Sequence, residues 1–337
     1  MLKKHIFKIL LGFLFSAVLI YLTLKQIDFK NSLELIKNAD YYVLLLGVLI
    51  YAVTYVLRSV RYYFMILPIK KTKILENFPY TVLGFFMNNI IPLRLGELIR
   101  AKVTGERLGI SRSSVLGTIL IERLMDIIIF VLFFFLIMFV IPFPEFIKKS
   151  FYVCAVVFGT GLFVLFLISR NEGKALKIVS RFPMPSKIKN FVTELFNKFA
   201  HGLGALKNPA VFSIIFLMTV VIWVTESMFL VIVAYSCGIK ISLLGGIFTV
   251  IIIGIGAIIP TAPGYIGAFE FMGITAMSVL SVSKDSAFAC IAIYHFLQIT
   301  VIFILGFGSI VKTKISFADL FKFAKIEEEK SGKEAQS

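Results

Sequence analysis

Asn88-Asn89-Ile90-Ile91-Pro92-Leu93-Arg94-Leu95-Gly96 and Ile258-Ile259-Pro260-Thr261-Ala262-Pro263-Gly264 each interrupt an apolar segment of the chain. Proline and glycine break a helix, and the freed backbone groups are tolerated at membrane depth only where protein or water satisfies them. We therefore expect two re-entrant hairpins built from half-helices, over Asn77–Leu93 and Ile241–Phe269. The residues expected to shape the two breaks are Asn89, Pro92, Gly96, Pro260, Pro263, Gly264 and Gly267.

The composition around these stretches is that of a membrane protein. Of 337 residues, 59% are apolar and 16% are charged, and the mean hydropathy is +0.94. A soluble domain is roughly half apolar and about a quarter charged, so an ordinary soluble enzyme, a disordered regulator and a disulfide scaffold are excluded. In a membrane protein, a net charge of +16 indicates an excess of lysine and arginine in the loops on one side of the membrane. We therefore expect no nucleic-acid partner. The three cysteines are far apart and indicate packing residues, neither disulfides nor a metal site.

Six other apolar segments are long enough to cross the hydrocarbon core as helices. The first follows lysines but has no small-residue cleavage site after it, so we interpret it as a retained helix and not as a signal peptide. The fold class expected is an all-α polytopic membrane protein with six spanning helices and the two hairpins. The expected spans are Ile6–Leu24, Tyr41–Leu67, Val115–Ile141, Phe151–Ser169, Val211–Cys237 and Ser286–Val311.

The distribution of lysine and arginine predicts the orientation. Cytoplasmic loops carry the positive excess, and this arrangement puts 25 basic residues on the side of the N-terminus, residues 68–114, residues 170–210 and the tail, against 7 in the opposite loops. If both broken segments were full crossings, residues 94–114 would move to the outside with their five basic residues. We therefore expect both termini in the cytoplasm and location in the cytoplasmic (inner) membrane.

The two broken segments belong to an internal repeat. Ile90-Ile91-Pro92 with Gly96 matches Ile258-Ile259-Pro260 with Gly264, and Leu108 to Ser114 aligns with Leu280 to Ser286. We expect one membrane domain over residues 1–312, with inverted repeats of about 1–145 and 146–312, followed by a charged cytoplasmic tail over 313–337. Inverted repeats with paired broken helices are typical of secondary transporters, whose substrate site lies where the breaks meet. A duplicated scaffold without a transport role is the alternative.

Ionisable residues inside the spans are expensive and usually face a cavity or each other. Arg58 and Arg61 share a helix face; Arg61 is as consistent with reaching the interface as with function, whereas Arg58 lies deeper. Glu122 and Asp126 share another face, and Arg123 can reach Asp126. A self-neutralised packing cluster is the alternative interpretation there.

Other candidate residues lie in the fifth span, the last span and the hairpins. Glu226 is in mid-span and needs a partner from another helix, which we expect to be an arginine. Arg94 and Arg100 follow the first break, where a new half-helix would favour an anionic group such as phosphate. Glu97 and Glu270 belong to the same lining, although each is also consistent with local capping or pairing. His295 is interpreted as a packing residue that is also able to carry a proton.

These residues resemble the motifs of the lysylphosphatidylglycerol synthase transmembrane (flippase-like) family, over roughly residues 6–312. The resemblance rests on Arg58-Ser-Val-Arg61, on Asn89 to Arg100, on Glu122-Arg123-Leu-Met-Asp126 and on Pro260 to Glu270, with Tyr265 where that family usually has a second glycine. It implies that the membrane module moves a lipid between leaflets. Bifunctional members join this module to a soluble aminoacyltransferase domain, which we do not expect in this protein, so synthase activity is not implied.

The leading hypothesis is therefore a lipid translocase (flippase) for a phospholipid or polyprenyl-phosphate-type lipid, anionic or aminoacylated. Its headgroup residues would be Arg58, Arg94, Glu97, Arg100, Glu122, Arg123, Asp126, Glu226 and Glu270. The alternatives are a non-transporting partner of a lipid-modifying enzyme and an intramembrane lipid-modifying enzyme. We expect no enzyme activity, catalytic residue, cofactor or metal, since the chain has no HExxH or GxSxG motif and no Cys-His pairing.

Overall fold

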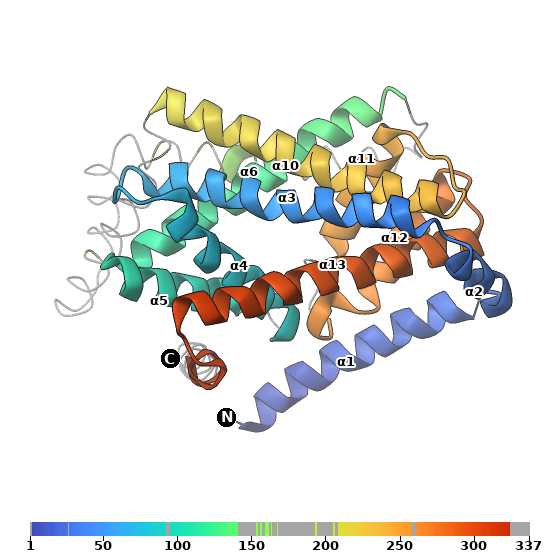
Figure 1. Cartoon of the computed structure of the whole chain (residues 1–337), viewed down its shortest axis with the longest axis horizontal. Coiled ribbons are helices and arrows are strands. Elements are labelled where there is room, and N and C mark those ends of the chain that lie inside the picture. The colour runs from blue at the N-terminus through green and yellow to red at the C-terminus, as the bar shows by residue number, and fades with distance from the viewer. Residues whose placement is uncertain are drawn as a thin grey trace. The chain divides into compact units, whose positions relative to one another are not determined.

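The computed structural model describes residues 2–25, 27–91, 95–140, 208–257 and 261–323, a few isolated residues between 141 and 207, and side chains from residue 12 onward. Every described element is a helix, and this part of the chain has no β-strand. The elements are α1 (Leu2–Leu24), α2 (Phe29–Lys37), α3 (Tyr41–Ile66), α4 (Ile74–Ile90), α5 (Gly96–Leu108), α6 (Arg112–Ile137), α10 (Pro209–Ser236), α11 (Leu243–Gly256), the 3-10 turn η3 (Pro263–Tyr265), α12 (Ala268–Val279) and α13 (Lys284–Thr313) (Figure 1).

Three of the described helices, α3, α10 and α13, are long and apolar enough to cross a membrane. A fourth crossing is counted if α1 and α2, which meet at an angle of 89° in the blue part of Figure 1, form one bent span. The helix α6 has 26 residues, but Glu122, Arg123 and Asp126 interrupt its apolar sequence. The predicted span Phe151–Ser169 lies outside the continuously described residues, so the count of six spans stays a prediction.

The two predicted breaks are present in the secondary structure. The first lies between α4 and α5, and the second separates α11 from α12, with η3 between them. After each break the second helix is followed by a helix with a serine N-cap: Ser111 caps α6 and Ser283 caps α13. These caps are 172 residues apart, which is the offset between the aligned segments Leu108 to Ser114 and Leu280 to Ser286, whereas the two break motifs are 168 residues apart. The inversion of the two halves across the membrane stays a prediction.

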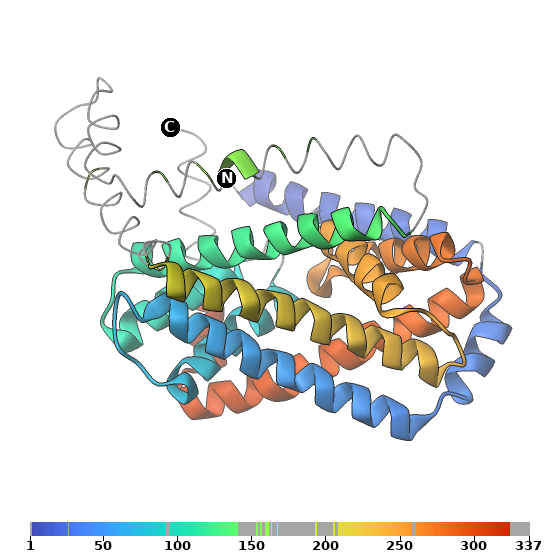
Figure 2. The same cartoon turned by 90° about the horizontal axis from the view of Figure 1, so that it is seen from above.

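The chain forms two compact units, each built from separate segments. Unit 1 contains Met1–Val56, Val82–Ile99 and Ile222–Ser337, and unit 2 contains Leu57–Thr81 and Arg100–Val221. Within unit 1, α12 packs against α1, α11 and α13, and α13 also packs against α2; Figure 2 shows this group from above in orange and blue. Unit 2 has an apolar core in which Met65 of α3, Ile121 and Met125 of α6 and Ile215 of α10 are fully buried.

The backbone ends at the two breaks lie against each other inside unit 1. A Cβ atom added to Gly264 would be 3.7 Å from the backbone oxygen of Asn89, at the end of α4. The second segment is also tied to α1, because the backbone N–H of Ala262 donates to Ser16 Oγ over 2.8 Å. Pro92, Arg94 and Pro260 lie outside the described residues.

Candidate functional site

A network of buried charges joins three helix segments of unit 2. The α6 carboxylates Glu122 and Asp126 are one turn apart, so they share one helix face. Arg61 of α3 contacts both, with Nη1 2.6 Å from Asp126 Oδ1 and Nη2 3.2 Å from Glu122 Oε1. Arg100 of α5 contacts the other oxygen of Glu122, with an Nη1 to Oε2 distance of 2.9 Å. Two carboxylates of one helix thus hold two arginines from different helices.

The network is extended by Arg123 and Thr219. Arg123 Nη2 lies 3.0 Å from Glu122 Oε1, and its Nη1 lies 3.3 Å from Asp126 Oδ2, which confirms the predicted contact at three residues' spacing. Arg61 Nη1 also donates to Thr219 Oγ1 of α10 over 3.1 Å. The side chain of Arg61 is 0% exposed, so the interpretation that it reaches the membrane interface is wrong. Arg58 is also buried, one turn earlier on α3, and its charge acts on Glu122.

Several donors in this network have no hydrogen-bond partner among the described residues. They are Nε and Nη2 of Arg100 and Nε of Arg61. Arg61 Nη2 lies 3.2 Å from Glu122 Oε1, but its N–H groups do not point at that oxygen well enough to form a hydrogen bond. The Arg100 guanidinium lies 3.9 Å over the Tyr62 ring, and the buried Tyr62 hydroxyl lies beside the hydroxyls of Thr104 and Thr118. A buried polar group without a partner costs about 1–3 kcal/mol. The set is rich in donors, so it suits a ligand rich in acceptors.

Sequence reasoning missed Arg61, Tyr62 and Thr104 as members of this cluster. The available signals were the spacing of three residues between Arg58 and Arg61 and the spacing of four between Arg100 and Thr104. Neither spacing indicates how deeply a helix face is buried. Thr104 and Tyr62 are uncharged, so a search for ionisable groups in apolar segments passes over them.

The other predicted acids lie in unit 1. Glu270 is near the start of α12, and its Oε2 accepts the backbone N–H of Gly267 over 2.7 Å, which confirms the local capping interpretation. Its Oε1 lies 2.6 Å from His295 Nδ1 of α13. Glu226 is buried in α10, and Glu97 is in the first turn of α5. The pairing of Glu226 with an arginine stays a prediction.

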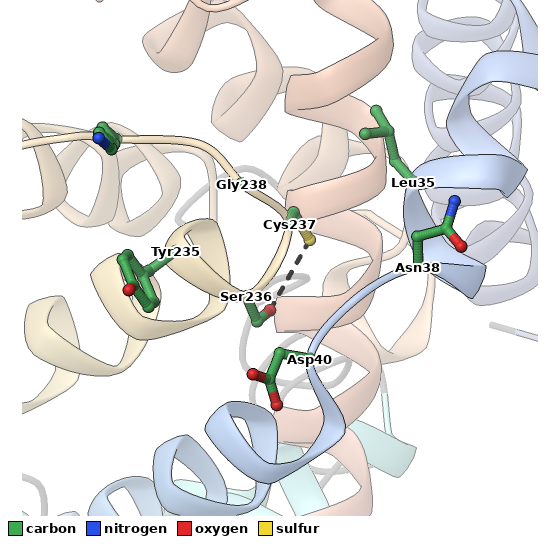
Figure 3. A pocket seen from close by; sticks show the side chains of 8 residues that line it. Leu35, Asn38, Asp40, Tyr235, Ser236, Cys237 and Gly238 are labelled. Carbon is green, nitrogen blue, oxygen red and sulfur yellow. Dashed lines mark hydrogen bonds between the residues drawn. The ribbon is translucent and has the colours of Figure 1, made fainter.

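A cavity of about 440 Å³ lies elsewhere in unit 1, where the end of α10 meets the α2–α3 connection (Figure 3). The Asp40 carboxylate beside it accepts the backbone N–H groups of Tyr42 and Val43, so it serves to cap α3. Ser236 Oγ and Cys237 Sγ, joined by the dashed line in Figure 3, are 3.8 Å apart. In the described part of the chain, no group of three or more His, Cys, Asp or Glu side chains is arranged to hold a metal ion.

Curated relatives of this chain include membrane proteins and a named enzyme. It is 23% identical to a UPF0104 membrane protein of Methanocaldococcus jannaschii over 66% of this chain and 91% of that protein, and 24% identical to a UPF0104 membrane protein of Methanothermobacter thermautotrophicus over 77% and 80%. It is also 22% identical to Glycosyltransferase AglD of Haloferax volcanii, over 91% of this chain and 55% of that protein.

The family model described as "Lysylphosphatidylglycerol synthase TM region" matches residues 9–306. This match covers nearly all of the described helices, including the charged network of unit 2 and both helix breaks. The chain is therefore a multi-pass membrane protein that belongs to the family of the lysylphosphatidylglycerol synthase transmembrane region.

Proposed function

We propose that this protein is a lipid translocase that moves a phospholipid or a polyprenyl-phosphate-type lipid between the leaflets of the cytoplasmic membrane. The observation that carries the proposal is the set of buried donors on Arg61 and Arg100 that have no hydrogen-bond partner among the described residues. Phosphate oxygens only accept hydrogen bonds, and a planar guanidinium can donate two parallel bonds to them. A lipid phosphate would therefore satisfy these donors.

The carboxylates of the same network have a second role under this proposal. Glu122 and Asp126 hold the arginines in place before a ligand arrives, so little reorganisation is needed on binding. If the lipid carries an aminoacyl group, its ammonium would also find these acids nearby. The acyl chains would stay in the bilayer while the headgroup passes.

The sharpest test is Arg100→Lys, with Arg112→Lys as its matched control. Lysine keeps the charge beside Glu122 but lacks the donor positions of Arg100 Nε and Nη2, whereas Arg112 forms an exposed ion pair with Glu106 and is outside the network. The probe is fluorescently labelled phosphatidylglycerol in vesicles of phosphatidylcholine and phosphatidylglycerol, with chemical quenching of the outer leaflet. We expect Arg100→Lys to slow translocation roughly ten- to a hundredfold, from about 1.5–3 kcal/mol for a hydrogen bond to a charged group.

Arg112→Lys should translocate the probe at the wild-type rate, and thermal unfolding should show that both variants are folded. Unchanged translocation in folded Arg100→Lys would remove the network from the transport path. Native mass spectrometry of lipids retained by the wild type and lost in Arg100→Lys would identify the lipid class.

One observation favours a second candidate, a non-transporting partner of a lipid-modifying enzyme. This chain aligns with 55% of a relative named as a glycosyltransferase, so in that protein a matching segment shares a chain with a further segment. Co-purification of a stoichiometric enzyme, unchanged in Arg100→Lys, together with no lipid movement by the wild type, would favour this candidate over the translocase.

A further inference from the structure

Unit 1 contains a partly buried carboxylate–imidazole pair, Glu270 and His295, which lies outside the charged network of unit 2. The Glu270 Oε1 to His295 Nδ1 distance is 2.6 Å, and the side chains are 19% and 6% exposed. The His295 ring is stacked on Phe269 with centroids 3.9 Å apart and an interplanar angle of 11°. Phe269 in turn contacts Tyr294, which packs against Phe229 of α10. The imidazole is therefore held on one face by the Phe269 ring and on one edge by the Glu270 carboxylate.

This geometry assigns the two ring nitrogens different roles. The carboxylate oxygen accepts, so Nδ1 carries the hydrogen and Nε2 keeps its lone pair in the neutral ring. No described residue forms a hydrogen bond with His295 Nε2; the ring's one hydrogen-bond contact in that part of the chain is Glu270. Nε2 is thus the position at which a proton from water would bind.

The helices packed around Glu270 and His295 contribute few other titratable groups. Of the helices packed on α12, α11 has no titratable residue, and the described side chains of α1 include only the exposed Tyr21. On α13 the nearest titratable groups are Tyr294 and Cys290, and α10 carries Glu226 three residues before Phe229. The charged groups of α2 and of the end of α13 that contacts it are Asp28, Lys30, Glu34, Lys37, Lys284 and Asp285, and Lys312 lies at the opposite end of α13.

Asp285 lies ten residues before His295, about 15 Å along a helix at the usual rise. The ionised pair therefore carries one net negative charge in largely apolar surroundings. Proton uptake at Nε2 gives an imidazolium beside a carboxylate, so the pair then carries no net charge.

The pair is joined directly to the second helix break. Glu270 Oε2 accepts from the N–H of Gly267, whose φ is +94°. Gly264 and Tyr265 also have positive φ, at +70° and +60°, and positive φ is costly for a tyrosine. A Cβ on Gly267 would lie 2.8 Å from the backbone oxygen of Ser16. A change of charge on Glu270–His295 therefore acts on a segment that is strained and closely packed against α1.

From this arrangement we propose that Glu270 and His295 form a proton-binding site that couples proton movement to lipid translocation, an inference that rests on the proposed function. A proton from water on one side binds His295 Nε2, the broken segment rearranges as the pair becomes neutral, and the proton leaves to water on the other side. One proton accompanies each lipid.

The experiment uses the full chain in the same vesicles, with a pH-sensitive dye inside and the same labelled phosphatidylglycerol as probe. At equal pH on both sides the label should equilibrate. With a difference of one pH unit, coupling of one proton to one lipid should shift the equilibrium ratio of label between leaflets about tenfold, and internal pH should change as lipid moves. His295→Gln keeps an amide donor for Glu270 but binds no proton, so its ratio should stay at the equal-pH value.

Glu270→Gln is the second variant and should also lose the response, whereas Cys290→Ala, which alters a buried thiol of the same helix, should keep it. A wild type that equilibrates the label but shows no response to the pH difference overturns this inference and leaves the proposed function standing. A response retained in folded His295→Gln overturns it too. A wild type that moves no label at equal or unequal pH overturns the proposed function, and the coupling with it.

Discussion

Under the proposed function, Arg100 serves both packing and lipid binding. One guanidinium nitrogen pairs with Glu122, the plane covers the Tyr62 ring, and the remaining two nitrogens are buried without a hydrogen-bond partner among the described residues. A buried ion pair is weak evidence of stabilisation, because desolvation offsets the attraction between the charges. Here the unused donors supply the additional argument for a ligand.

Tyr62→Phe separates stability from binding at this position. The substitution keeps the ring beneath Arg100 and removes a buried hydroxyl that lies beside the hydroxyls of Thr104 and Thr118. We expect the thermal unfolding temperature in detergent to change little, since the hydroxyl forms no well-aligned hydrogen bond among the described residues. Retention of co-purified anionic lipid, measured by native mass spectrometry, should decrease. A clear loss of stability with unchanged lipid retention would make the hydroxyl a structural group.

At the scale of single elements, sequence predicted the two helix breaks, because local chemistry determines them, whereas the serine caps of α6 and α13 were not predicted. Proline and glycine place the breaks after α4 and α11, and Ser111 and Ser283 begin α6 and α13 by accepting a backbone N–H three residues on. Sequence did not decide how Arg61 is used, because its partners Glu122, Asp126 and Thr219 come from distant helix segments. The Glu270–His295 pair likewise depends on the packing of α12 on α13.

The close packing of the first break gives a prediction for Gly96. A Cβ atom there would be 2.3 Å from the backbone oxygen of Gly84 and 2.6 Å from the backbone nitrogen of Asn88, so α5 would have to separate from α4. We expect Gly96→Ala to destabilise the protein by about 1–3 kcal/mol or more, measured as a lower thermal unfolding temperature in detergent.

Gly308→Ala is the matched control for this prediction, because a Cβ at Gly308 of α13 would meet no atom within 4 Å. Its unfolding temperature should equal that of the wild type or exceed it, since alanine favours helix over glycine. Equal unfolding temperatures for the two variants would mean that α4 and α5 can separate at little cost.

At the scale of the whole molecule, the prediction to test is the side of the membrane on which the basic residues lie, because the structure of single helices does not determine it. Three described helices, or four with the bent α1–α2 pair, are long and apolar enough to cross. The excess of lysine and arginine in residues 68–114 predicts that α4 and α5 enter and leave the membrane on the cytoplasmic side. Lys71 and Arg112 flank this helix pair, and both are exposed.

The orientation can be tested with single cysteines at Lys71, Arg112 and Lys240, after the native Cys154, Cys237 and Cys290 are replaced by alanine. In right-side-out membrane vesicles, a membrane-impermeant maleimide should label Lys240→Cys directly, and should label Lys71→Cys and Arg112→Cys only after permeabilisation. A full crossing of the membrane by α4 and α5 would place Lys71 and Arg112 on opposite sides, so exactly one of them would be labelled before permeabilisation. Labelling of both from the same side as Lys240 would instead exclude the orientation predicted from the basic residues, because the positive excess would then face outward.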